Sequence, residues 1–230
     1  MSVVAIIPAR GGSKGLPRKN LRRIAGRSLV GWSVLAGLEA TLVDEVVVSS
    51  EDQEILEEAV RCGARALPRP GELATDEAST DSVLVHAMNV LGWKHEVVVL
   101  LQPSVPIRDP GLVDEAVRRL VDTGADSLFT AEPLHFVWRR VARSNHSGGL
   151  IPGPLVQINC SGRRIRRQEF SWADERYRED GSVFVCRAKL LADTQARLGG
   201  RIEILPTTRT PDIDSEEHLQ IARAIFGSAT

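Results

Sequence analysis

Apolar residues recur along the chain in seven short runs, separated by longer amphipathic segments. The runs are rich in Val, Ile and Leu, as is typical of strands that are buried on both faces. They cover residues 3–7, 44–49, 64–67, 96–101, 126–132, 181–186 and 201–205. Helical spacing appears between them, over residues 28–40, 51–61, 80–91, 110–123, 187–196 and 217–226. This alternation predicts an α/β fold with a parallel sheet and right-handed crossovers.

Some details of this fold can also be predicted. The run 96–101 is the most hydrophobic, so we expect it at the centre of the sheet. Ser50 is the expected N-cap of the helix over 51–61, and Ser79 or Thr80 the expected N-cap of the helix that runs to Leu91.

The regular pattern fails between residues 133 and 180. This segment contains Gly-Gly and Pro-Gly-Pro sequences and nine arginines. An unstructured loop of that length is uncommon inside a compact domain. We therefore expect an inserted β-rich lobe within one domain that spans residues 1–230.

Composition excludes several classes of protein. The net charge is -1 and aromatic residues make up 4% of the chain, which gives no support to a nucleic-acid partner. No apolar run approaches the ~20 residues of a membrane span, so we expect no membrane association. Three scattered cysteines form no Cys-x-x-Cys pair, and the chain enters a strand without a targeting segment. These features predict a cytoplasmic protein.

A glycine-rich basic loop follows the first apolar run. Three glycines can turn backbone N–H groups toward an anion: Gly11, Gly12 and Gly15. Four cations surround them: Arg10, Lys14, Arg18 and Lys19. The spacing fits neither a P-loop nor a Gly-x-Gly-x-x-Gly motif. A polyphosphate site and a solvated surface turn both remain possible on these residues alone.

The full string from Ala5 to Asn20, AIIPARGGSKGLPRKN, resembles the signature of the acylneuraminate cytidylyltransferases, the CMP-sialic acid synthetases. Four later segments resemble the same family, in the same order: residues 69–81, 101–108, 166–181 and 212–214. The resemblance implies a Rossmann-like nucleotidyltransferase fold with a mixed, mostly parallel sheet. It also implies CMP transfer from CTP to a sialic-acid-like acceptor, Mg²⁺ as cofactor, and a homodimer joined through the lobe at 133–180.

The resemblance assigns residues to the nucleotide and to the acceptor. The implied nucleotide-binding residues are Ala9, Arg10, Gly11, Gly12, Ser13, Lys19, Asn20, Arg69, Ala78 and Thr80. Arg10 and Lys19 would hold the triphosphate and stabilise charge as pyrophosphate leaves. The implied acceptor-binding residues are Gln102, Arg167, Tyr177, Arg178 and Asp180, with Arg108 a structural or acceptor-side cation.

Asp180 departs from the family pattern, which has an asparagine there. An ionised carboxylate only accepts hydrogen bonds, whereas an amide also donates them. The spacing between the strings that contain Arg167 and Asp180 is also longer than in the family. A small anionic phosphonate is therefore an alternative acceptor, giving a CMP-phosphonate. A non-catalytic nucleotide-binding homologue is a third possibility.

Asp212 and Asp214 flank Ile213 near the C-terminal end of the chain. In an extended segment they would face the same side, and two carboxylates suit Mg²⁺. The alternative is that Asp214 only caps the last helix. The family has the same Asp-Ile-Asp string as its metal site, so the resemblance favours metal binding, with Asp212 also catalytic.

Overall fold

The computed structural model describes residues 1–134, 137–144, 150–157, 176–208 and 211–228. Eleven strands are present in these segments: β1 (Val3–Pro8), β2 (Arg23–Ile24), β3 (Arg27–Ser28), β4 (Glu45–Ser50), β5 (Arg65–Pro68), β6 (Val97–Leu101), β7 (Ser127–Leu134), β8 (Trp138–Ser144), β9 (Leu150–Gln157), β10 (Arg176–Arg187) and β11 (Ile202–Pro206). The α-helices are α1 (Leu29–Glu39), α2 (Gln53–Arg61), α3 (Thr80–Val90), α4 (Leu112–Thr123), α5 (Ala188–Thr194) and α6 (Glu216–Ser228). Two 3₁₀ turns complete the set: η1 (Lys19–Leu21) and η2 (Gly71–Ala74).

Seven strands form one sheet in the order β11-β7-β10-β6-β1-β4-β5. All neighbours are parallel except β10, which runs antiparallel to both β6 and β7. The sheet is therefore mixed and mostly parallel, as the family resemblance implies. All seven apolar runs are strands of this sheet, and β6 is its fourth and central member, as predicted.

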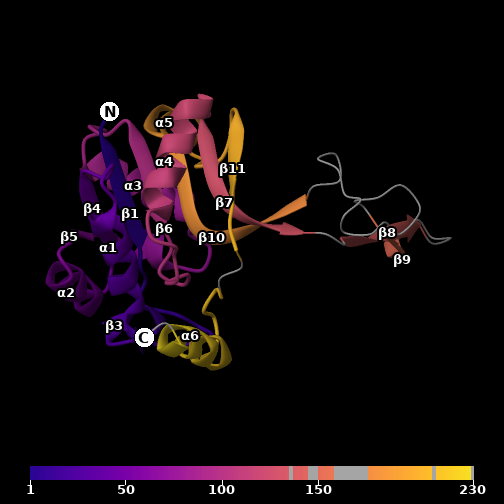
Figure 1. Cartoon of the computed structure of the whole chain (residues 1–230), viewed down its shortest axis with the longest axis horizontal. Helices are drawn as coiled ribbons and strands as arrows, with labels where there is room; N and C mark the ends of the chain where they lie inside the picture. Colours follow the sequence, from indigo (N-terminus) through magenta and orange to yellow (C-terminus); the bar gives the residue numbers. More distant parts are fainter. Residues whose placement is uncertain (135–136, 145–149, 158–175, 209–210, 229–230) are drawn as a thin grey trace.

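Helices cover both faces of the sheet, and each face has its own apolar core (Figure 1). Side chains alternate between the two faces along each strand. Ala5 and Ile7 of β1 belong to one core, and Val4 and Ile6 to the other. All four are fully buried, which explains why the strands appear in the sequence as continuous apolar runs.

One predicted helix cap is wrong and the other is confirmed. The N-cap of α2 is Asp52, whose carboxylate accepts from the N–H groups of Glu54 and Ile55; Ser50 is the last residue of β4. Ser79 caps α3, as one of the two predicted alternatives.

The sequence patterns missed the short β2–β3 hairpin, whose turn residues Ala25 and Gly26 have positive φ.

The segment that was expected to form a lobe contains an antiparallel hairpin, β8 paired with β9. Figure 1 places this hairpin beyond the ends of β7 and β10, away from the helices that cover the sheet. Within the described residues, no helix is both long and apolar enough to cross a membrane.

A third, smaller apolar cluster positions the end of the chain. Leu219 and Ala222 of α6 pack with Leu16, Ile24 and Ile213. Trp32 and Phe226 add a ring contact, with centroids 4.5 Å apart. Burying a side chain such as Ile213 contributes about 1.5–3 kcal/mol. This cluster fixes both the Asp212–Asp214 segment and the N-terminal loop at the same edge of the sheet.

Candidate active site

A cleft of about 390 Å³ lies at the carboxyl ends of β1 and β6, where open α/β sheets bind ligands. Nine of the predicted site residues line it: Arg10, Ser13, Lys19, Asn20, Arg69, Ala78, Thr80, Gln102 and Asp214. Gly11 and Gly12 belong to the same loop without lining the cleft, and Ala9 is fully buried beneath it.

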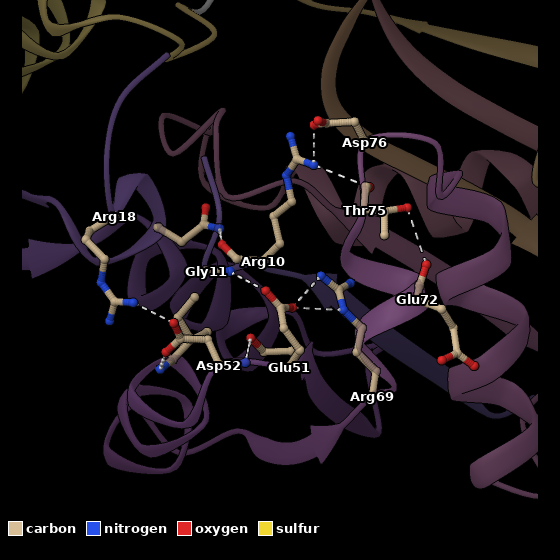
Figure 2. Close-up of polar contacts among 12 residues, drawn as sticks. Arg10, Gly11, Arg18, Glu51, Asp52, Arg69, Glu72, Thr75 and Asp76 are labelled. Atoms are coloured by element: carbon tan, nitrogen blue, oxygen red, sulfur yellow. Dashed lines mark hydrogen bonds and ion pairs between the residues drawn. The ribbon is translucent and has the colours of Figure 1, made fainter. Parts of the chain in front are cut away.

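Polar contacts hold the loop in place. The N–H of Gly11 donates to Glu51 Oε1 at 2.7 Å, while Arg69 Nη2 donates to Glu51 Oε2 at 3.0 Å (Figure 2). Asn20 is buried and donates through Nδ2 to the carbonyl oxygen of Arg10 at 2.8 Å. Glu51 thus joins the loop to the wall of the cleft that carries Arg69.

The cations of the cleft are paired with carboxylates. Arg10 Nη1 lies 2.9 Å from Asp76 Oδ1, and Lys14 Nζ lies 2.5 Å from Asp76 Oδ2. These two contacts lower the pKa of Asp76, and the hydrogen bond from Lys14 is the larger cause. Arg10 also approaches the carbonyl of Thr75, and Arg18 pairs instead with Asp52 (Figure 2). Arg10 and Lys14 therefore converge on one anionic group, which a phosphate could replace.

Close packing explains why two positions of the loop, 11 and 15, are glycine. A Cβ on Gly15 would overlap the carbonyl oxygen of Asp214, and a Cβ on Gly11 would overlap the carboxylate of Asp52. Gly12 has nothing within 4 Å of the corresponding position. The loop is therefore in direct contact with the Asp212–Asp214 segment at Gly15.

The two candidate metal ligands lie where the cleft meets a second pocket. Asp214 lines the cleft, and its Oδ1 accepts from Lys19 Nζ at 2.8 Å. Asp212 lines the second pocket. The Asp212 side chain is solvent-accessible, but surrounding atoms partly desolvate its carboxylate, and this desolvation raises its pKa. A hydrogen bond from Ser104 lowers the pKa, whereas the negative charge of Asp214 raises it further.

Asp214 is not the cap of the last helix. The Oγ of Ser215 accepts from the N–H of His218 at 3.2 Å, as an N-cap does, so the carboxylate of Asp214 is left for the cleft. In the described part of the chain, no three His, Cys, Asp or Glu side chains form a group that could hold a metal. Two carboxylates fit Mg²⁺ only if phosphate oxygens or water complete its coordination, which is its usual arrangement.

The second pocket has a volume of about 650 Å³ and shares Gln102 with the cleft. Arg178 and Asp180 line it as well, and Arg178 pairs with Glu132. Tyr177 lies opposite Pro133 in the β10–β7 pair and is not part of the lining. Arg167 lies outside the described residues.

Asp180 makes several internal hydrogen bonds. Its Oδ1 accepts from Thr130 Oγ1 at 2.6 Å and from the N–H of Ser182 at 2.8 Å, and its Oδ2 accepts from Thr207 Oγ1 at 2.5 Å. All three partners are donors, so a carboxylate suits this position.

Arg108 is a structural cation. It donates to the carbonyl oxygens of Gln102 and Ser182 and to Ser33 Oγ. Burial lowers its pKa to about 9, while the charge of nearby Asp180 acts in the opposite direction. Arg108 therefore ties the end of β6 to β10 behind Gln102.

The sequence patterns missed several residues of the site. Glu51 and Asp76 bind the loop and its cations, and His218, Ile221 and Ile225 of α6 line the second pocket. A signal for His218 was present, because it lies one helical turn after Asp214. A signal for Asp76 was also present, because it lies within the string 69–81 that resembles the family. Glu51 lies in no such string, so no local pattern could have identified it.

Comparison with known proteins places these features in context. A cytidylyltransferase family model matches residues 4–144. The pseudaminic acid cytidylyltransferase of Campylobacter jejuni is 28% identical over 98% of this chain and 97% of its own length. The CMP-N,N'-diacetyllegionaminic acid synthase of Legionella pneumophila is 30% identical over 85% of this chain and 82% of its own.

A solved structure shows the same fold. The CMP:2-keto-3-deoxy-manno-octonic acid synthetase complexed with CTP superimposes with a TM-score of 0.74 and 19% identity, covering all of both chains.

Proposed function

Because the chain belongs to the acylneuraminate cytidylyltransferase family and is a CTP-dependent nucleotidyltransferase, we propose that it transfers CMP to the anomeric hydroxyl of a nonulosonic acid. The observation that carries this proposal is the junction of two pockets at Gln102 and the Asp212–Asp214 pair. One pocket is a basic cleft suited to a nucleoside triphosphate, and the other is larger and less basic. The reacting atoms would meet at the junction.

In the proposed reaction, the acceptor hydroxyl oxygen forms a bond to the α-phosphorus of CTP, and its proton passes to the acceptor's own carboxylate or to water. The bond from that phosphorus to the α–β bridging oxygen breaks, and pyrophosphate leaves with the electron pair. Arg10 and Lys19 line the cleft and would stabilise charge that develops on the leaving group. Gln102 would orient the acceptor, and the rest of catalysis is positioning.

Asp212 and Asp214 would hold a magnesium ion, together with phosphate oxygens. When bound, the ion supplies Lewis-acid stabilisation of the phosphates. In the structure, Lys19 forms an ion pair with Asp214. In the proposed complex Asp214 would instead contact the magnesium ion, and the Lys19 ammonium group would turn to the triphosphate. Asp212, which lines the acceptor pocket, would stay between the two substrates.

The test is pyrophosphate release with CTP and Mg²⁺ against a panel of nonulosonic acids and small phosphonates. Turnover with a nonulosonic acid is expected, and Asp212→Asn should reduce it by several orders of magnitude. Turnover with phosphonates alone would overturn the acceptor assignment.

We further propose a homodimer in which the lobe completes the partner's acceptor site. The family resemblance and the position of the β8–β9 hairpin beyond the sheet support it (Figure 1). If Arg167 acts in the partner's site, mixing inactive Arg167→Ala and Asp212→Asn chains should restore about a quarter of wild-type activity, since half the dimers would be mixed and each would have one intact site. Failure of the mixture to regain activity, with exchange of chains verified, would exclude this arrangement.

A further inference from the structure

One wall of the second pocket is apolar. Ile221 and Ile225 project from α6, and Phe184 of β10 lies in the same lining. The two isoleucines are 46% and 43% exposed, so they present aliphatic surface to the pocket that they line. They are four residues apart, so they share one face of the helix. His218, one turn earlier on the same face, also lines the pocket.

Several of the charged groups that line the rest of the pocket are held by partners, and among the described residues of α6 the two isoleucines share the lining with no ionisable side chain except His218. Arg178 is paired with Glu132, and Asp180 accepts from internal donors. Arg197 is paired with Asp81 at 2.7 Å, and its guanidinium lies over the ring of Phe184 at 4.6 Å from the centroid. The pocket is therefore divided into a polar end, at Gln102 and Asp212, and an apolar end along α6.

Both ends belong to one continuous pocket, because Ile221 and Ile225 line it together with Gln102 and Asp212. The two isoleucines are about 6 Å apart along the axis of α6, at a rise of about 1.5 Å per residue. An acceptor whose anomeric hydroxyl is at the polar end would extend its far substituents toward the isoleucines.

We propose that Phe184, Ile221 and Ile225 form a subsite for acyl or methyl substituents of the acceptor. The subsite would favour a nonulosonic acid with two acylamino groups over one with a polyhydroxylated side chain. This inference rests on the proposed function and specifies the acceptor. Its physical basis is that the isoleucines remain exposed to water until an apolar group covers them.

The test compares two acceptors, an N,N'-diacetylated nonulosonic acid and a mono-N-acetylated one with a hydroxylated side chain. Ile221→Ser, Ile225→Ser and the double variant are measured against wild type. Val121→Ser is the matched control, because Val121 is an exposed aliphatic residue (41%) on α4 outside both pockets. Thermal unfolding confirms that each variant is folded.

The expected result is a rise in KM for the diacetylated acceptor of about three- to tenfold in each single variant. The KM for the hydroxylated acceptor and for CTP should stay unchanged, and the control should match wild type. An equal change for both acceptors would overturn the subsite. So would a loss of dimer mass in the isoleucine variants, because the face would then be a subunit interface.

Failure of the underlying proposal has a different signature. If wild type converts neither nonulosonic acid, the proposed function and the subsite are both wrong. If wild type converts both acceptors and the isoleucine variants leave their ratio unchanged, the subsite alone is wrong.

Discussion

Gly15→Ala tests how the loop and the candidate metal site depend on each other. The backbone of Gly15 has an ordinary φ, so alanine is conformationally acceptable, but its Cβ would overlap the carbonyl oxygen of Asp214. That oxygen belongs to the backbone and cannot rotate away, so one segment has to move by roughly half an ångström. A displacement of ~1 Å in an active site can cost ~100-fold in rate, so we expect kcat/KM to fall about tenfold or more.

The assay is pyrophosphate release at varied CTP and Mg²⁺ concentrations. Gly71→Ala is the matched control, because Gly71 also has no positive φ, its Cβ would meet nothing within 4 Å, and it is not among the site residues. We expect the control to retain wild-type activity to within about twofold and Gly15→Ala to require more Mg²⁺. Equal kinetics for the two variants, with unchanged thermal stability, would refute the claim that Gly15 positions Asp214.

Three further predictions follow from charged contacts. Asp76→Asn should free Arg10 and Lys14 and lower the KM for CTP several-fold at low salt, with the difference shrinking at high salt; an unchanged KM would contradict this. Arg108→Met should cost about 1–3 kcal/mol in urea denaturation, because the carbonyl oxygens of Ser182 and Gln102 lose the charged donor that they share, although that of Gln102 still accepts from the N–H of Val105. Burial opposes ionisation of Glu45, but hydrogen bonds from Arg65, Lys94 and His95 outweigh it and lower its pKa from 4.5 to about 2. Glu45 therefore stabilises the fold above pH 4.5, and this contribution is lost as the pH falls toward 2. Glu45→Gln should reduce stability at neutral pH by on the order of 1–3 kcal/mol, allowing for screening, and a difference that persists near pH 2 would refute the assignment.

The sheet could be predicted because its inner strands β1, β4 and β6 are buried on both faces. Each of the seven apolar runs is a strand, and their alternation with helices gave the parallel arrangement of β1, β4, β5 and β6. The antiparallel insertion of β10 between β6 and β7 could not be derived from periodicity, because an apolar run carries no information on strand direction. Only the family resemblance implied a mixed sheet.

The candidate site, too, could be predicted only in part. Residues within one continuous string, such as Arg10 to Asn20, were found because their types and spacing are local. Contacts that close the site join distant strings, as Glu51 joins Gly11 to Arg69 and as Asp76 joins Arg10 to Lys14. Glu51 is an ordinary acidic side chain after a strand and carries no distinguishing local pattern. Asp76 lies within the string 69–81, but its contacts with Arg10 and Lys14 could not be predicted from that string.

Asp180 shows how a departure from a family pattern can be misread from sequence. The substitution of a carboxylate for an amide suggested a different acceptor, since an acceptor-only group cannot replace an amide at a sugar. In the structure, the carboxylate has three internal donors, from Thr130, Ser182 and Thr207. A carboxylate accepts from all three at once, whereas an asparagine would accept through its single oxygen and donate through its NH₂ group to the Thr207 hydroxyl, which can also accept. The carboxylate also favours the charge of Arg108, which ties the ends of β6 and β10 together behind Gln102. These internal partners give the carboxylate a structural role, so its presence does not by itself identify the acceptor.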